Sequence, residues 1–307
     1  MKIVLLDALT FGETDLSAFD TLGEVEVFST TSKEQTQERI KDAEVIVTNK
    51  VVITKEMMQN SQNLKLICVA ATGMNNVDLE GAKELGIEVK NVAGYSTSSV
   101  IQHTFSMLFY LIGSSRYYDE VVKSGEYSKS PIFTDVSHPF FEIKGKKWGI
   151  IGLGEIGRGV ANIASAFGAE VCYYSTSGAN VTADFERVNL EYLLQNCDII
   201  TIHAPLNDAT KNLLNYANLL DVKEGAVILN LGRGGIIDEE AIAKIIDEKE
   251  ILFGLDVLTQ EPMRTDHPLL SIKNKDNLYI TPHIAWTSVE AREKLIASVV
   301  ENIKSLN

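Results

Sequence analysis

The chain has 307 residues, and its 42 acidic and 28 basic residues give a formal net charge of −14. With 45% hydrophobic and 23% charged residues, this length predicts two globular domains, each large enough for its own core. The negative charge disfavours nucleic acid and anionic membranes as partners, because both are bound through clustered positive charge. A small anionic substrate remains compatible, since it needs only local charge in a pocket.

The cysteines and the N-terminus indicate the compartment. Cys68, Cys172 and Cys197 are odd in number and lie in or beside apolar runs. This favours buried thiols in a reducing compartment over a disulfide framework. None is near a His at metal-ligand spacing, so we expect no metal. The N-terminal MKIVLLDALT is short and interrupted by Asp7, unlike a signal peptide, and no apolar run reaches the roughly 18 residues of a membrane span. We therefore expect a cytoplasmic protein.

The first hundred residues alternate between β-branched runs and amphipathic stretches. Strands are predicted at residues 2–7, 25–28, 44–49, 64–71 and 87–92. Strands and helices that alternate at this spacing are typical of a parallel sheet covered by helices. The first half is therefore expected to form an α/β domain of its own.

A long apolar helix is predicted over residues 98–118, where apolar side chains recur at helical spacing. Ser98 or Ser99 is its candidate N-cap. The helix is either a core element or a subunit contact, and a dimer interface would account for its apolar composition.

A second α/β series follows a loop that contains Pro131 and Pro139. Its strands are predicted at residues 147–152, 170–175, 198–204, 226–232, 252–257 and 277–282. One amphipathic helix is predicted for the final stretch, TSVEAREKLIASVVENIKSL.

The first strand of this series runs into WGIIGLGEIGRG, residues 148–159, which has the spacing of a dinucleotide-binding turn. Gly152 permits the tight turn, Gly154 removes a Cβ that would block a pyrophosphate, and Gly157 lets the next helix pack on the strand. The helix N-terminus then offers free N–H groups to the phosphates. The apolar strand before the turn and the Ala-rich helix after it favour a cofactor site.

The acid expected about 20 residues after such a turn is missing. Ser175 stands in its place and is followed by Thr176 and Ser177. These hydroxyls can bond either the ribose 2′-OH of NAD or the 2′-phosphate of NADP, and no Arg stands directly there. Both cofactors therefore remain open, as does the alternative that residues 175–177 are simply a polar turn.

Arg233, Glu261 and His283 each lie at or just beyond the carboxyl end of a predicted strand, the edge where doubly wound sheets bind ligands. Their chemistry fits reduction of a 2-keto acid. An Arg binds the carboxylate with a fork of donors, a His delivers a proton near neutral pH, and a carboxylate orients the His and favours its protonated form. Each residue alone is more often a turn, loop or half-buried residue. Of the other histidines, His103 is expected to pack or cap within its helix, whereas His203 is expected to line the cofactor site.

Taken together, GLGEIG, IHAPLNDAT, NLGRGGIIDEEAI, LDVLTQEP and TPHIAW closely resemble the D-isomer-specific 2-hydroxyacid dehydrogenase family over essentially the whole chain. The resemblance implies that Arg233, Glu261 and His283 are the catalytic set, and that Thr72 and Gly73 offer backbone N–H groups to the substrate carboxylate. The cofactor-binding residues are expected to be Gly152, Gly154, Glu155, Ile156, Gly157, Ser175, Thr176, His203, Ala204, Pro205, Leu231, Gly232, Asp256 and His283.

The resemblance also implies an α/β fold of two Rossmann-like or flavodoxin-like domains with parallel sheets, the cofactor domain being inserted into the substrate domain. The substrate domain would comprise residues 1–98 plus 283–307, and the NAD(P)-binding domain residues 99–282. The glycine turn lies near the middle of the chain because its domain is inserted. A homodimer through the cofactor domain and the helix at 99–118 is expected.

The variants LDVLTQEP and TPHIAW, with Trp286 after His283, are most similar to the glycerate dehydrogenase, or hydroxypyruvate reductase, branch. This implies interconversion of hydroxypyruvate or glyoxylate with glycerate or glycolate, using NAD or NADP. Two alternatives remain: a D-lactate or other D-2-hydroxyacid dehydrogenase, and a dinucleotide-sensing binding protein that resembles the corepressors of this fold.

Overall fold

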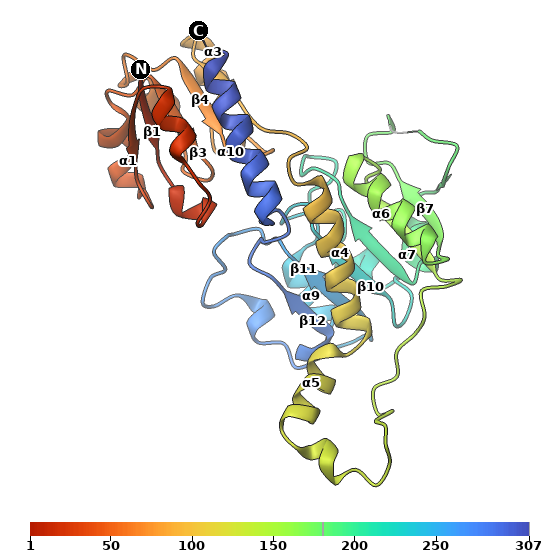
Figure 1. Cartoon of the computed structure of the whole chain (residues 1–307). Coiled ribbons are helices and arrows are strands. Elements are labelled where there is room, and N and C mark those ends of the chain that lie inside the picture. Colours follow the sequence, from red (N-terminus) through yellow and green to blue (C-terminus); the bar gives the residue numbers. More distant parts are fainter. Residues whose placement is uncertain (180, 307) are drawn as a thin grey trace. The chain divides into compact units, whose positions relative to one another are not determined.

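A computed structural model describes residues 1–179 and 181–306 of the chain. The chain divides into two compact units: unit 1 is Met1–Ser96 with Thr287–Asn307, and unit 2 is Thr97–Trp286. Unit 2 is thus inserted into unit 1, which holds both ends of the chain (Figure 1). These bounds lie close to the expected boundaries at 98/99 and 282/283. Among the described residues, no helix combines the length and apolar character needed to cross a membrane.

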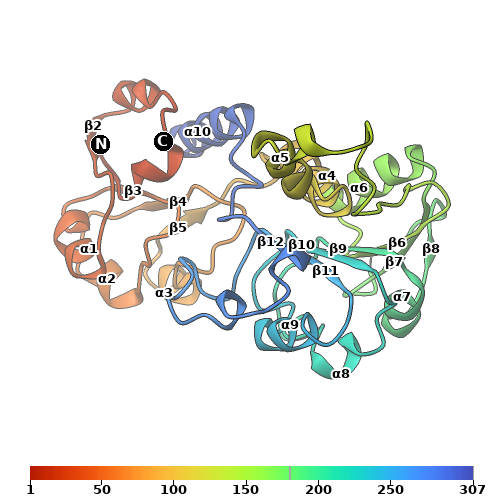
Figure 2. The same cartoon turned by 90° about the horizontal axis from the view of Figure 1, so that it is seen from below.

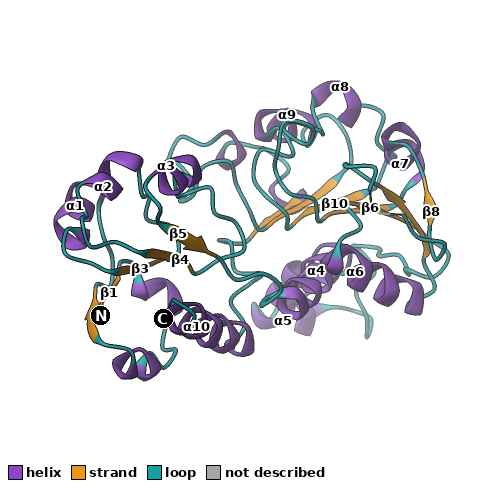
Figure 3. Cartoon of the chain, turned by 90° about the horizontal axis from the view of Figure 1, so that it is seen from above, coloured by secondary structure: helices purple, strands orange, loops and turns teal. Residues whose placement is uncertain are grey.

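Unit 1 contains a five-stranded parallel sheet in the order β2-β1-β3-β4-β5. Its strands are β1 (Lys2–Leu5), β2 (Glu24–Val27), β3 (Val45–Thr48), β4 (Leu66–Val69) and β5 (Glu88–Lys90). Its α-helices are α1 (Lys33–Ile40), α2 (Lys55–Gln59), α3 (Leu79–Glu84) and α10 (Val289–Lys304). Helices α1, α2 and α3 cover one face of the sheet and α10 the other (Figure 3). Because helices cover both faces, β3 and β4 are buried along their whole length and read as continuous apolar runs.

Unit 2 contains a seven-stranded parallel sheet in the order β12-β11-β10-β9-β6-β7-β8, which can be followed across Figure 2. Its strands are β6 (Lys147–Ile151), β7 (Glu170–Tyr174), β8 (Glu186–Arg187), β9 (Ile199–Ile202), β10 (Val227–Asn230), β11 (Leu252–Leu255) and β12 (Leu278–Ile280). The chain starts at β6, builds outward to β8, and then returns to β9 on the other side of β6. This reversal makes the carboxyl ends of β6 and β9 the topological switch point, where such sheets bind ligands.

Two apolar cores sandwich the sheet of unit 2. Helices α4 (Thr97–Ile112) and α6 (Glu155–Ala166) cover one face (Figure 3). Helices α7 (Leu190–Asn196), α8 (Tyr216–Leu219) and α9 (Glu239–Ile245) cover the other. The α/β class, the parallel sheets and the eleven strands predicted from sequence are confirmed, and the three cysteines are free and buried as expected.

Three sequence-based details were wrong. The helix predicted over 98–118 is two helices, because Gly113 and Ser114 end α4, and Ser114 adopts a left-handed φ of 46° before α5 (Ser115–Lys123) begins. Ser98 and Ser99 lie inside the first turn of α4 and so are not its N-cap; the Ser99 hydroxyl instead donates to the Ala285 carbonyl. Strand β8 was missed, since its two residues are polar and exposed.

Candidate active site

The glycine turn follows β6, and each glycine has a different surrounding. Gly152 has a φ of 93°, and a Cβ there would lie 2.8 Å from the Ala204 backbone nitrogen, so only glycine fits. A Cβ on Gly157 would lie 2.3 Å from the Gly152 carbonyl oxygen, because helix α6 packs directly on the turn. The turn therefore brings the start of α6 against the carboxyl ends of β6 and β9.

Gly154 caps α6 without any side-chain hydrogen bond. Among the described residues, no heavy atom outside its own chain neighbours lies within 4 Å of where its Cβ would be. A Cβ on Gly154 would thus point into open space beside the N-terminus of this twelve-residue helix, a geometry that suits a phosphate.

Buried polar groups flank this space at the ends of the neighbouring strands. Ser175 directly follows β7, and His203 directly follows β9. Within the described part of the chain, the Ser175 hydroxyl and both His203 ring nitrogens are buried without a hydrogen-bond partner. Burial lowers the pKa of His203 to about 3, so its ring is neutral. Unpaired buried polar atoms usually await a water or a ligand, and these fit a dinucleotide across the switch point.

The structure also brings a cation to the turn after β7, which sequence spacing did not reveal. Strand β8 pairs with β7, so that Arg187 lies beside Tyr173. The Arg187 guanidinium donates to the Gly178 carbonyl over 3.5 Å. The turn at 175–178 therefore carries one positive charge despite the acidic balance of the chain.

The Glu261 and His283 side chains meet beyond β11 and β12. The Nδ1 of His283 donates to the Glu261 Oε2 over 2.6 Å, and the His283 and Glu261 side chains are 21% and 31% exposed, respectively. Because the carboxylate accepts the Nδ1 proton, it fixes the ring orientation and leaves Nε2 for a reacting group. The Leu258 N–H donates to the other Glu261 oxygen over 2.9 Å, which fixes the carboxylate as well.

Arg233 follows β10, the neighbour of β11 in the sheet. Its backbone carbonyl accepts a hydrogen bond from the Asn230 side chain, and its guanidinium donates to the Gly232 carbonyl, both over 2.8 Å. Arg233 therefore lies at the same sheet edge as Glu261 and His283, and its guanidinium contacts the Gly232 carbonyl through Nη1.

The backbone around His283 is held by a buried carboxylate. His283 has a left-handed φ of 56°, which is unusual for a residue other than glycine. Asp256, 1% exposed, accepts from the Thr281 hydroxyl over 2.6 Å and from the N–H groups of Ile284 and Ala285 over 2.8 and 2.9 Å. Asp256 was expected only to bind the cofactor, and this role in fixing the His283 segment was missed.

A match to a known family accompanies this geometry. The D-isomer specific 2-hydroxyacid dehydrogenase NAD binding domain matches residues 105–285, more than half of the chain. The chain belongs to the D-isomer-specific 2-hydroxyacid dehydrogenase family. The matched residues lie within unit 2, and the protein is an oxidoreductase that uses NAD or NADP.

Several known proteins are similar to this 2-hydroxyacid dehydrogenase over almost its whole length. A hydroxypyruvate reductase from Blautia hydrogenotrophica is 36% identical over 99% of this chain and 96% of its own length. A glycerate dehydrogenase from Methylorubrum extorquens is 34% identical over 99% of this chain and 95% of its own. Among solved structures, an acyclic imino acid reductase in complex with NADPH and D-Arg is 31% identical, with a TM-score of 0.87, over 99% of this chain and 96% of that one.

The other histidines of this dehydrogenase make structural contacts. His103 on α4 lies 3.2 Å from the Thr281 hydroxyl. Burial lowers the His103 pKa, and the nearby Asp256 charge opposes this effect. His138 lies against Tyr117 with ring centroids 3.7 Å apart. His267 Nε2 lies 2.8 Å from the Glu239 Oε2.

The remaining expected site residues follow strands or begin helix α6. Ala204 and Pro205 follow β9, and Leu231 and Gly232 follow β10, all at the sheet edge that carries the glycine turn. Glu155, Ile156 and Thr176 lie in the first turn of α6 and after β7. Thr72 and Gly73 lie in unit 1, beyond β4, where the Thr72 hydroxyl donates to the Val92 carbonyl over 3.1 Å.

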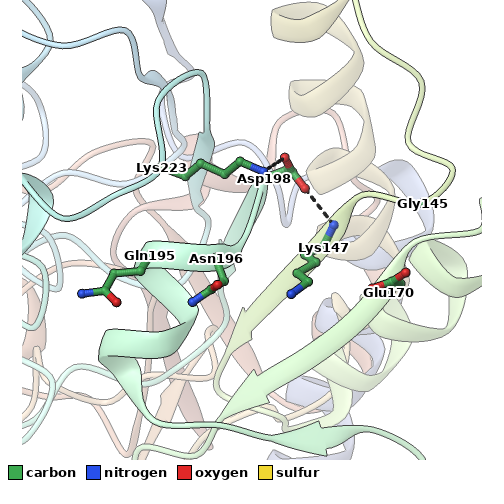
Figure 4. Close-up of a pocket in the computed structure, with 7 residues that line it drawn as sticks. All are labelled: Gly145, Lys147, Glu170, Gln195, Asn196, Asp198 and Lys223. Carbon is green, nitrogen blue, oxygen red and sulfur yellow. Dashed lines mark hydrogen bonds and ion pairs between the residues drawn. The ribbon is translucent and has the colours of Figure 1, made fainter.

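A polar pocket of about 460 Å³ lies at the opposite edge of the same sheet (Figure 4). Lys147 and Glu170 begin β6 and β7, and Asp198 directly precedes β9, so the pocket is at the amino ends of the strands. Asp198 accepts from the Lys223 ammonium over 2.6 Å and from the Lys147 N–H over 2.9 Å. The pocket is therefore separate from the carboxyl edge that bears the candidate active site.

Proposed function

We propose that this dehydrogenase reduces a small 2-keto acid, hydroxypyruvate or glyoxylate, to the corresponding D-2-hydroxy acid, glycerate or glycolate, and catalyses the reverse reaction. The observation that carries the proposal is the 2.6 Å contact between His283 Nδ1 and Glu261 Oε2. Because Nδ1 is bonded to Glu261, the ring is held in one orientation and Nε2 is left for the substrate. Both residues lie at the carboxyl edge of the unit 2 sheet, where we propose that the cofactor binds. The printed names of the relatives, hydroxypyruvate reductase and glycerate dehydrogenase, support the substrate class.

The nicotinamide, when bound, supplies a hydride to the carbonyl carbon. His283 Nε2 gives a proton to the carbonyl oxygen, so that the ketone becomes a secondary alcohol, and it accepts this proton in the reverse direction. Glu261 acts through His283: it accepts the Nδ1 proton and stabilises the imidazolium that forms in the oxidative direction. Arg233 binds the substrate carboxylate with its guanidinium fork and polarises the carbonyl.

Thr72 and Gly73 of unit 1 are proposed to bind the same carboxylate through their backbone N–H groups, which makes unit 1 the substrate domain. We also infer a homodimer built on unit 2. Its support is the exposed apolar surface of α4, α5 and the following loop, where Phe109, Val122 and Phe133 are accessible, Phe133 to 90%. The three free thiols support a reducing compartment, the cytoplasm.

The direct test follows NADH and NADPH oxidation with hydroxypyruvate, glyoxylate, pyruvate and 3-phosphohydroxypyruvate. Fastest turnover with hydroxypyruvate or glyoxylate supports the proposal. Preference for pyruvate would instead indicate a D-lactate dehydrogenase. Tight cofactor binding without turnover of any of these acids would favour a dinucleotide sensor.

A further inference from the structure

A buried Glu–His pair lies in unit 2 behind the candidate active site. Glu239 occupies the first turn of α9, and its Oε1 accepts both the N–H and the hydroxyl of Thr259, over 2.6 and 2.8 Å. Its Oε2 lies 2.8 Å from His267 Nε2. The Glu239 carboxylate thus joins helix α9 to the turn after β11 through Oε1 and to His267 through Oε2.

The protonation of His267 follows from its contacts. His267 caps the short helix at Pro268–Leu270, and its Nδ1 accepts the Leu269 N–H over 3.3 Å. The proton must therefore be on Nε2, which donates it to Glu239. The side chains of His267 and Glu239 are 7% and 11% exposed, so this charge-assisted hydrogen bond is largely shielded from water.

The Leu258–Thr259 turn, to which Glu239 is bonded, contacts Glu261 and the loop that carries Arg233. The Leu258 N–H donates to Glu261 Oε1 over 2.9 Å. A Cβ on Gly234 would lie 1.9 Å from the Leu258 carbonyl carbon and 2.3 Å from the Thr259 nitrogen. The Arg233 loop therefore packs backbone to backbone against this turn. A shift of residues 258–259 would displace Glu261 directly and press on the loop of Arg233.

We propose that Glu239 and His267 are positioning residues for the dehydrogenase reaction. Together they form a clamp that fixes the Leu258–Thr259 turn. The fixed turn keeps Glu261 in contact with His283 and keeps the Arg233 loop in place beside them. This inference rests on the proposed function, because it assigns the clamp a role in proton transfer. Its physical basis is that misplacing a reacting group by about 1 Å can cost about 10²-fold in rate. Of the two residues of this turn, Leu258 packs against the apolar core and Thr259 is exposed, so a change at Thr259 leaves the core contact in place.

The test uses paired variants of His267 in the full-length chain. His267→Phe keeps a ring but removes the donor to Glu239, and it is expected to lower kcat by about 10- to 100-fold with little change in the dissociation constant of NAD(P)H. His267→Gln keeps an N–H that can reach Glu239 and is expected to recover most of that loss. Thr259→Val at the exposed end of the clamp is expected to fold normally and to lower kcat by about three- to tenfold, since it removes one hydrogen bond to a carboxylate, whereas Thr259→Ser keeps the hydroxyl.

The matched control is Asp198→Asn, which weakens a comparable charged contact at the opposite edge of the sheet, in the pocket of Figure 4. It is expected to lower the free energy of unfolding while kcat stays at the wild-type value. If Asp198→Asn and His267→Phe reduce kcat equally at equal loss of stability, or if His267→Phe keeps the wild-type kcat, the clamp has no positioning role.

A second readout is independent of turnover: the imidazole NMR signals of His283, which report its Nδ1–H bond to Glu261. We expect this bonded proton to be lost or broadened in His267→Phe and restored in His267→Gln. A wild-type protein without activity on any 2-keto acid would contradict the proposed function, and the NMR result would still show whether Glu239 and His267 position Glu261. An unchanged His283 signal in His267→Phe would overturn this positioning role.

Discussion

Glu261 Oε2 and His283 Nδ1 lie 2.6 Å apart although 22 residues separate them in the chain. The two residues follow adjacent parallel strands, β11 and β12, whose carboxyl ends share one edge of the sheet. Asp256 at the end of β11 then accepts the two N–H groups that follow His283. One strand end therefore supplies both the orienting carboxylate and the anchor for the imidazole backbone.

Replacing Glu261 by Gln should lower kcat/KM for hydroxypyruvate by roughly 10- to 150-fold. The amide keeps the shape and can still accept from Leu258, but it loses a charged hydrogen bond worth about 1.5–3 kcal/mol, and 1.36 kcal/mol corresponds to tenfold in rate. Steady-state kinetics measure this loss. Glu240→Gln, at an exposed position of α9, is the control and should leave kcat/KM unchanged. Wild-type kinetics in Glu261→Gln would remove Glu261 from the reaction.

Ser175→Asp should shift the cofactor preference toward NADH. An aspartate after β7 can bond the ribose 2′-OH and repels a 2′-phosphate, so the ratio of kcat/KM for NADH to that for NADPH should rise about tenfold or more, equivalent to about 1.4 kcal/mol. Ser165→Asp adds the same charge at an exposed position near the end of α6 and should leave the ratio unchanged. If Ser175→Asp also leaves it unchanged, Ser175 does not lie at the ribose.

Stability should fall in mild acid because of His203. Burial lowers its pKa to about 3 in the folded protein, whereas an unfolded His titrates near about 6.5. Below pH ~6.5 the unfolded state therefore binds a proton that the folded state does not. The contribution of His203 to the free energy of unfolding is complete above that pH and is reduced by about 2 kcal/mol at pH 5.

Urea unfolding of the cofactor-free protein between pH 5 and pH 8 measures this dependence. His203→Phe should flatten the acid side of the profile, and His138→Asn, which changes an exposed His, should not. The same acid slope in His203→Phe and the wild type would mean that other groups cause it.

The strands were predictable because parallel sheets buried on both faces leave continuous β-branched runs, as in β3 and β9. The Glu261–His283 contact could likewise be predicted from the sequence, since both residues follow predicted strands. Strand β8 could not, because its two residues, Glu186 and Arg187, are polar and form no apolar run. The break at Gly113 was missed because a single glycine inside a helical pattern is tolerated and does not by itself mark a helix end.

The hydrogen bonds that hold the candidate active-site residues in place could not be predicted from the sequence. Asp256 and Thr281 lie 25 residues apart, and Glu239 and His267 lie 28 apart. Neither pair has a spacing that distinguishes it from solvated residues. Only the fold brings these groups together and excludes water from them. Their hydrogen bonds were therefore visible only in the structure.

The central claim is that His283 transfers the proton in reduction of a 2-keto acid. The measurement that tests it most directly compares the rate of NAD(P)H-dependent hydroxypyruvate reduction by the wild type and His283→Ala, with cofactor binding measured in parallel by fluorescence. We predict that kcat falls by about 10²–10⁴-fold while the cofactor dissociation constant changes little. A His283→Ala protein that reduces hydroxypyruvate at the wild-type rate would contradict the account.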